Sequence, residues 1–294
     1  MNTILLSSDS VMAIFPLEKS HSSGQAKTER ELIREAFAVG EKAAREATTI
    51  FGDCNELECE KTALPYLLFK KKTYCARVFE DPDGDPKLDV KGLAVVRRDC
   101  CEWVANTLRQ TLNELIMERS VSNAKSVIET QLHRLVNCEV TIPELTLSKR
   151  LSGSYKSQNL PQLTVVRKME QRNKGSAPKS GDRVAFCIIE GGPKQKIFDR
   201  AEDVTFIANN HDTVKVDRMH YLTNELMKPV CQLFGPFHPN PRQLFEGAEM
   251  ELERQRKGHV TLFSVDWLAH APTRKVDNPQ PVAKKRKTQQ TLLC

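Results

Sequence analysis

The spacing of apolar residues changes near Asp99, and this change limits the fold more than any other feature of the sequence. Upstream of Asp99, apolar residues fall in short runs that predict strands over 64–78 and 88–97. Downstream, they recur at intervals of three and four residues, which is the spacing of one face of a helix. The sequence therefore predicts an α+β fold, with a small mixed part over residues 1–98 and a largely helical part over residues 99–270.

Caps and turn-forming residues place the remaining elements. Thr28-Glu29-Arg30-Glu31 is a capping box, so a helix is expected to start there and to end at Gly52. Segment 81–86 is dense in Asp, Pro and Gly, which predicts a turn. The other predicted elements are a hairpin over 1–15, helices over 103–116, 127–136 and 161–171, a strand over 183–189, and a last helix from Asp217 to about residue 226.

The charge of the chain is concentrated in two segments. The net charge is +6, but residues 148–183 carry nine basic and two acidic side chains, and residues 271–294 carry six basic and one acidic. The rest of the chain is therefore acidic. A polyanionic partner is expected for segment 148–183, and the alternative is a merely solvated surface.

Composition excludes several classes of protein. Apolar residues make up 39% and charged residues 28% of the chain, which argues against wholesale disorder. No apolar run approaches the roughly 20 residues of a membrane-spanning helix, and the first ten residues lack the basic start of a secretory signal. Nine cysteines without a C-x-x-C pair predict reduced thiols in the cytosol or nucleus. We therefore expect neither secretion nor a membrane partner.

Four groups of motifs follow one another between residues 9 and 237. They are Asp9-Ser10-Val11-Met12; Leu57-Glu58-Cys59-Glu60-Lys61 with Lys71-Lys72-Thr73-Tyr74; the run Lys91-Gly92-Leu93-Ala94-Val95-Val96-Arg97-Arg98-Asp99; and Gly181-Asp182-Arg183-Val184 with Arg200-Ala201-Glu202-Asp203 and Tyr221-Leu222-Thr223. In order and spacing, these motifs resemble the C-terminal third of family B DNA polymerases, in the delta-like group of eukaryotes and large DNA viruses. The resemblance implies a C-terminal palm segment over 1–98 and a thumb over 99–270. The Pro- and Lys-rich composition of residues 271–294 predicts a disordered basic tail.

The resemblance also implies a reaction, the template-directed addition of dNTPs to a DNA primer. This is an in-line phosphoryl transfer, and two Mg²⁺ ions are its implied cofactors. Asp9 matches one of the two metal-ligating aspartates and is the expected catalytic residue, although taken alone it reads as a turn former. Glu58 and Glu60 would share a face of a strand. Either glutamate supports the metal site without touching the metal, or it pairs with a nearby lysine.

Contacts to primer–template DNA are implied in the palm. Lys71, Lys72 and Tyr74 match the element that follows the duplex, where cations contact phosphates or minor-groove acceptors without reading the sequence. Tyr74 is expected to combine a packed ring with a hydroxyl directed to the DNA or to Lys72.

Contacts to the duplex backbone are implied in the thumb. Arg97 and Arg98 are expected to bind phosphate or to brace the thumb through Asp99. The basic block over 148–183 is expected to grip the backbone with a salt-sensitive affinity, and four of its cations carry this prediction: Arg167, Lys168, Arg172 and Lys174.

Departures from the family pattern limit what the chain is expected to do by itself. Ser7 stands where the family has the first aspartate of its D-T-D motif. The family motif that bears the other metal-ligating aspartate is also absent ahead of Asp9, so one set of metal ligands is missing. We therefore expect the C-terminal part of a polymerase, which acts when an upstream polymerase half completes it. The alternatives are a non-catalytic DNA-binding remnant and an interaction module that acts through its tail.

The tail carries two short signals. The basic cluster Lys284, Lys285, Arg286 and Lys287 is suited to a nuclear-import receptor, and it also suits non-specific binding to nucleic acid. Residues 289–292, Gln-Gln-Thr-Leu, begin like a peptide that binds a sliding clamp but lack the aromatic residues that complete one. The expected location is the nucleus or a viral replication site.

Overall fold

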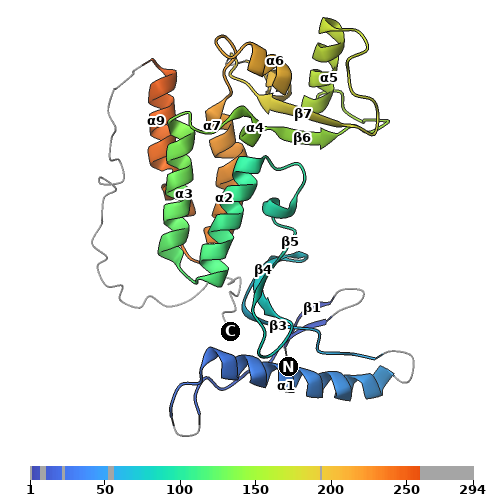
Figure 1. Cartoon of the computed structure of the whole chain (residues 1–294), viewed down its shortest axis with the longest axis vertical. Helices are drawn as coiled ribbons and strands as arrows, with labels where there is room; N and C mark the ends of the chain where they lie inside the picture. The colour runs from blue at the N-terminus through green and yellow to red at the C-terminus, as the bar shows by residue number, and fades with distance from the viewer. Residues whose placement is uncertain (1, 7–10, 22–23, 52–55, 193, 259–294) are drawn as a thin grey trace. The chain divides into compact units, whose positions relative to one another are not determined.

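The computed structural model describes residues 2–6, 11–21, 24–51, 56–192 and 194–258 (Figure 1). The chain forms two compact units. The first unit holds the described residues of Met1–Leu93 together with Ile116–Arg119, and the second holds Ala94–Leu115 and the described residues from Ser120 onwards. Among the described residues, no helix combines the length and apolar character needed to cross a bilayer.

The first unit begins with a hairpin and a long helix. Strands β1 (Asn2–Leu6) and β2 (Val11–Ile14) pair antiparallel, which confirms the predicted hairpin. Helix α1 spans Glu29–Phe51. The Thr28 amide donates to Glu31 Oε2 at 2.7 Å and the Glu31 amide donates to Thr28 Oγ1 at 3.3 Å, so the predicted capping box is confirmed. Gly52, the predicted helix end, lies outside the described residues.

One face of α1 packs on the three-stranded sheet of the first unit. Ile33 and Phe37, one helical turn apart, are 2% and 5% exposed and form a core cluster with Phe79. The half-buried side chains of Cys59 and Leu64 pack against this cluster. The sheet is antiparallel in the order β3 (Thr62–Lys70), β4 (Thr73–Phe79), β5 (Lys87–Lys91).

Both strand predictions in this region need correction. The single strand predicted over 64–78 is wrong, because β3 and β4 are two strands joined by a turn at Lys71 and Lys72. The strand predicted over 88–97 stops at Lys91, and Ala94–Val96 form the 3₁₀ turn η2. The turn falls within the polar run 70–73, Lys-Lys-Lys-Thr, which interrupts the apolar residues of the first segment. The second strand ends where Lys91-Gly92 interrupts the other segment. The turn predicted over 81–86 joins β4 to β5 and is confirmed.

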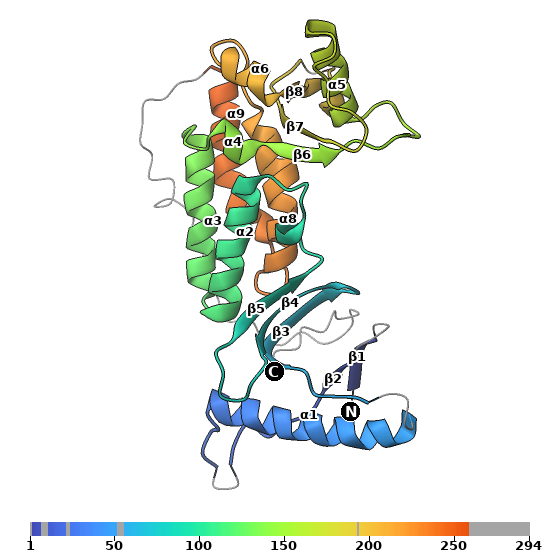
Figure 2. The same cartoon turned by 45° about the vertical axis from the view of Figure 1, so that its right-hand side comes forward.

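The helices of the second unit enclose its largest core. Figure 2 shows α2 (Glu102–Leu112), α3 (Val121–Val136) and α9 (Glu246–Arg256) side by side. The π-helical turn η3 (Asn113–Met117) follows α2. Trp103, Leu108, Ile128 and Leu132 are at most 1% exposed, which confirms the apolar faces predicted for the helices over 103–116 and 127–136. The Trp103 indole donates to Gln131 Oε1 at 3.1 Å, so its polar edge is satisfied.

A second antiparallel sheet lies within the part that was predicted to be largely helical. Its order is β6 (Leu147–Arg150), β7 (Arg183–Ile188), β8 (Ala201–Asp203), and helix α5 (Pro161–Arg172) packs on it. The helix predicted over 161–171 and the strand predicted over 183–189 are confirmed. Strands β6 and β8 were missed because they have four and three residues. A mixed helix and sheet fold is therefore correct for both units.

The remaining helices connect these layers. Asp217 caps α7 (Arg218–His220), since its Oδ1 accepts from the His220 amide at 3.1 Å, as predicted. The helix does not end near residue 226, because η5 (Tyr221–Leu226) leads into α8 (Met227–Phe234), whose buried face is also apolar. It is also not the last helix, because α9 follows. The other short helices are α4 (Ile142–Leu145), η4 (Ile197–Arg200), α6 (Val204–Asn209) and η6 (Pro241–Phe245).

Candidate nucleic-acid interface

Lys71 and Lys72 form the exposed turn between β3 and β4. Register pairs Lys70 with Thr73, so the two lysines are the tip of a tight hairpin. Lys72 has φ of 61°, a left-handed conformation that a lysine adopts only under constraint from its surroundings. Both side chains are exposed, and this arrangement holds two cations at one defined edge of the sheet.

Gly92 supplies the constraint on this turn. An added Cβ at Gly92, whose φ is 69°, would lie 2.2 Å from the carbonyl oxygen of Lys72 and 2.8 Å from Thr73 Oγ1. A backbone atom at that distance must move, so only glycine lets the chain after β5 pass beneath the lysine turn.

Substitution of Gly92 should therefore be costly. Gly92→Ala should lower the free energy of unfolding by about 2 kcal/mol, because it adds a backbone clash to the positive-φ strain. Gly24→Ala is the matched control, since Gly24 has φ of 83° but nothing within 4 Å of an added Cβ. It should cost about 1 kcal/mol or less. Urea unfolding of both variants measures the difference, and equal losses would show that the lysine turn does not depend on the close approach.

Tyr74 supports the sheet beneath the turn. Its ring is 7% exposed and stacks on Tyr66 with centroids 5.2 Å apart. Its hydroxyl donates to Asp89 Oδ2 at 3.4 Å, so the structure directs it to Asp89 and not to Lys72. Burial, with the neighbouring Asp89 carboxylate, raises the pKa of Tyr74. The packed ring agrees with the prediction, and the hydroxyl forms its hydrogen bond with Asp89 of the same unit.

The implied metal site cannot be assembled from the described residues. Asp9 lies outside them. Glu58 and Glu60 are exposed and alternate with the half-buried Leu57 and Cys59, but residues 56–61 do not form a strand. Across the described ranges, no group of three or more histidine, cysteine, aspartate or glutamate side chains is arranged to hold a metal ion. These residues therefore do not test the metal-site prediction for Asp9, Glu58 and Glu60.

Arg97 and Arg98 lie near the start of the second unit, which begins at Ala94. Arg97 donates from Nε and Nη2 to the two oxygens of Asp99, at 3.0 and 2.8 Å. This bidentate hydrogen bonding holds the pKa of the Asp99 carboxyl below its usual range. Two roles were predicted for Arg97, binding phosphate and bracing the thumb through Asp99. The structure shows the contact with Asp99. The Arg98 side chain is exposed, and its carbonyl accepts from Arg183 Nη2 at 2.9 Å.

The four cations predicted for the thumb divide into two pairs. Lys168 and Arg172 turn toward the sheet, where both contact Glu202 of β8. Arg167 and Lys174 are exposed. The Arg167 guanidinium donates to the carbonyls of residues 158 and 163, and its side chain remains at the surface.

Glu202 is the buried anion that fixes this division. It is 3% exposed and accepts from Arg172 Nη1 and Nη2, both at 2.9 Å, and from Lys168 Nζ at 3.2 Å. The Arg172 guanidinium also lies 3.5 Å from the centroid of the Phe206 ring. Burial by itself raises the pKa of Glu202, but the hydrogen bonds and the two cations outweigh burial and hold the pKa below its usual value.

Sequence reasoning gave no role to Gly92 or Glu202, although both lie in the motifs that carry the family resemblance. A glycine before an apolar run does not show which other segment of the backbone passes close to it. Glu202 stands next to Asp203 and outside the basic block 148–183, so the sequence does not show which cations it pairs with. Those two facts required the structure.

Comparison with known proteins supplies the family. The profile of "DNA polymerase family B" matches residues 25–237. The chain is 36% identical over 208 residues to the DNA polymerase delta catalytic subunit of Caenorhabditis elegans, a match that covers 70% of this chain and 19% of that protein. It is 38% identical over 211 residues to a DNA polymerase of Paramecium bursaria Chlorella virus NY2A, covering 70% and 23%.

One solved structure is also similar, that of the family B DNA polymerase from Pyrobaculum calidifontis. It shares 20% identity with a TM-score of 0.44, over 57% of this chain and 21% of that one. The chain thus spans about a fifth of the length of the curated relatives it matches. The family profile extends through most of both units, and on that match the chain belongs to DNA polymerase family B.

Proposed function

We propose that this chain supplies the C-terminal palm segment and the thumb of a replicative, delta-like DNA polymerase, with the palm over 1–98 and the thumb over 99–270. The family match over residues 25–237 carries this proposal. The partners that follow from it are primer–template DNA, dNTPs and an upstream polymerase half. Together with that half, the chain would take part in template-directed extension of a primer.

The role of this chain in that reaction is to hold the duplex. The lysine turn of the first unit presents Lys71 and Lys72, and the second unit presents Arg98, Arg167 and Lys174, all exposed. Cations at such positions contact phosphates and so hold any sequence in register, as a replicative enzyme requires. Lys168 and Arg172 serve the same surface indirectly, because their pairing with Glu202 fixes α5 on the sheet.

The chemistry of nucleotide addition is assigned to Asp9 and divalent metal ions. Family B polymerases generally use divalent metals, which lower the pKa of the attacking 3′-hydroxyl and neutralise the leaving pyrophosphate. Mg²⁺ as the ion, Asp9 as its ligand, and Glu58 or Glu60 as supporting carboxylates are part of the proposal. The basic cluster Lys284–Lys287 would direct the protein to the nucleus, or the protein would act at a viral replication site.

Primer extension tests this proposal. The 294-residue chain assayed by itself should bind duplex but extend no primer, because it supplies one set of metal ligands. Mixed with a chain that carries the upstream domains of a delta-like relative, it should extend a primer with Mg²⁺. Asp9→Ala should then reduce single-turnover extension by roughly 1,000-fold while duplex affinity stays within about twofold, since a metal ligand contributes to the reaction and little to backbone contacts.

Two outcomes would contradict the proposal. Extension by the chain alone that Asp9→Ala abolishes would show that it carries a full catalytic centre. Duplex binding with no extension in any mixture would instead favour the non-catalytic DNA-binding remnant.

A further inference from the structure

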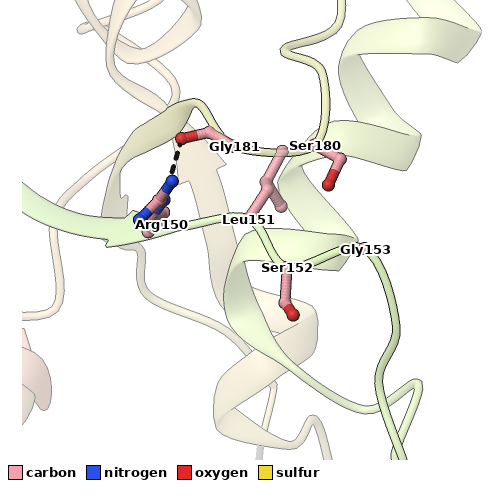
Figure 3. Close-up of a pocket in the computed structure, with 6 residues that line it drawn as sticks. All are labelled: Arg150, Leu151, Ser152, Gly153, Ser180 and Gly181. Carbon is pink, nitrogen blue, oxygen red and sulfur yellow. Dashed lines mark hydrogen bonds between the residues drawn. The ribbon is translucent and has the colours of Figure 1, made fainter.

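An open pocket of about 340 Å³ lies in the second unit, where the loop after β6 meets the loop before β7. Figure 3 shows its lining, which consists of Arg150, Leu151, Ser152, Gly153, Ser180 and Gly181. Five of these six residues are exposed, and Leu151 forms the buried floor. The site described above uses none of them.

The two loops are fixed to each other by backbone hydrogen bonds. The Leu151 amide donates to the Asp182 carbonyl at 2.8 Å, and the Gly181 amide donates to the Leu151 carbonyl at 3.0 Å. Gly181 has φ of 100°, a conformation that other residues rarely adopt. An added Cβ at Gly153 would lie 3.5 Å from Ser180 Oγ, so small residues face each other across the opening. The pocket is therefore formed before any ligand arrives.

Arg150 is held at the edge of this pocket by one of its nitrogens. Its Nε donates to the Gly181 carbonyl at 3.1 Å, which is the contact drawn in Figure 3. Within the part of the chain that the structure describes, the two terminal nitrogens of the guanidinium have no hydrogen-bond partner, so both can contact a second group. A planar pair of donors matches two oxygens of a phosphate, and Ser152 and Ser180 contribute exposed hydroxyls to the lining of the same pocket.

Strand register adds an independent reason to expect an anion here. Arg150 of β6 lies directly opposite Arg183 of β7, and like charges in that position destabilise a sheet. The contacts that Arg183 makes among the described residues are with uncharged groups, namely Ser148 Oγ and the carbonyls of Ser148 and Arg98. The nearby Asp182 carboxylate accepts from the Lys179 amide at 2.9 Å. An anion bound beside Arg150 would relieve the repulsion between the two arginines.

We propose that this pocket binds a single phosphate group of a nucleic-acid backbone, with Arg150 as its main ligand and Ser152 and Ser180 in the lining. The proposal rests on the proposed function, since duplex DNA is then the polymer that brings the phosphate. The net charge of segment 148–183 predicts a basic surface but no particular contact. The proposal names one contact, between Arg150 and a single phosphate.

Fluorescence anisotropy with a primer–template duplex over a range of salt concentrations tests the proposal on the full chain. Arg150→Ala should weaken binding about eightfold at 0.1 M salt and lower the log–log salt slope by about one, the effect of one lost phosphate contact. Lys215→Ala is the matched control, because Lys215 is an exposed cation elsewhere in the same unit. It should leave affinity within twofold and the slope unchanged.

A second variant separates lost binding from lost folding. Ser152→Asp keeps Arg150 but places a carboxylate in the pocket, and it should weaken duplex binding at least as much as Arg150→Ala. Thr205→Asp adds the same charge at an exposed position in the first turn of α6 and should have no effect. Single phosphates of the duplex can then be replaced by neutral methylphosphonates. At one position this replacement should weaken binding by the wild type and leave the affinity of Arg150→Ala unchanged.

The outcomes distinguish this proposal from the proposed function. If the wild type binds duplex and neither pocket variant differs from its control, the pocket proposal is overturned and the proposed function stands. If the wild type does not bind duplex, the proposed function fails. In that case, amide NMR shifts of Gly153 and Ser180 on titration with inorganic phosphate, lost in Arg150→Ala, would show a site for free phosphate and overturn the assignment to a polymer backbone. No shift would overturn both.

Discussion

Glu202→Gln should lower the free energy of unfolding of this protein by about 2 kcal/mol. Loss of one partner from a buried ion pair typically costs roughly 3–5 kcal/mol. We expect a smaller loss of about 2 kcal/mol because Lys168 and Arg172 are partly exposed. Their side chains are 26% and 36% exposed, against 4% for Glu202. The variant leaves two cations facing an uncharged amide, so α5 loses its charge pairing with β8 and keeps the hydrogen bond from Lys168 to the Ala201 carbonyl. Urea unfolding followed by circular dichroism measures the loss.

The matched control is Glu190→Gln, which removes the same charge from an exposed glutamate near the end of β7. It should change stability by less than about 0.5 kcal/mol, the range for surface substitutions. If both variants lose the same stability, Glu202 is not an anchor, and Lys168 and Arg172 are free to contact DNA as the sequence predicted.

The cost of Glu202→Gln should also depend on pH. Since the pKa of Glu202 in the folded protein is below the ordinary value of 4.5, the carboxylate stabilises the fold at pH values above that ordinary value. This contribution is lost as pH falls through the lower, folded-state pKa. The difference in stability between the wild type and the variant should therefore be constant above about pH 5 and shrink on acidification below about pH 4. A difference that grows on acidification would contradict the assignment.

The sequence predicts those elements that local chemistry determines. The Thr28 capping box, the apolar face of α2 and α3, the Asp217 cap and Pro161 at the start of α5 all act within one or two helical turns. Each was therefore readable without knowledge of the fold. The hairpin turn at Lys71 was not, because a lysine in the left-handed region carries no composition signal and Gly92, which permits it, comes twenty residues later.

The candidate site shows the same limit. The basic block was read as one surface because its cations lie close together in sequence. Glu202 divides them, and it lies 30 and 34 residues from Arg172 and Lys168. Helix periodicity places those two cations four residues apart on one face of α5, but only the position of β8 shows that both pair with a buried glutamate. Charge counting finds a polyanion-binding region, and tertiary packing decides which charges are available to it.

The lysine turn should make the largest single contribution of the first unit to duplex binding. Lys71 and Lys72 are exposed on a hairpin whose backbone Gly92 constrains, so their charges meet a duplex with little loss of conformational freedom. The double variant Lys71→Gln, Lys72→Gln should weaken binding to a primer–template by roughly 50-fold at 0.1 M salt and lower the log–log salt slope by about two. Glutamine keeps the length and polarity of each side chain, so the loss reports charge.

A second double variant makes this expectation specific to the turn. Lys61→Gln with Lys87→Gln removes the same charge from the same unit, but Lys61 and Lys87 already pair with Asp89 and Glu80. Because those lysines are neutralised locally, their loss should change affinity less than about threefold, a screened effect of net charge alone. Anisotropy titrations of the full chain at several salt concentrations give both affinities and both slopes. Equal losses in the two double variants would mean that the duplex responds to the overall charge of the unit, and the turn would then have no defined contact with DNA.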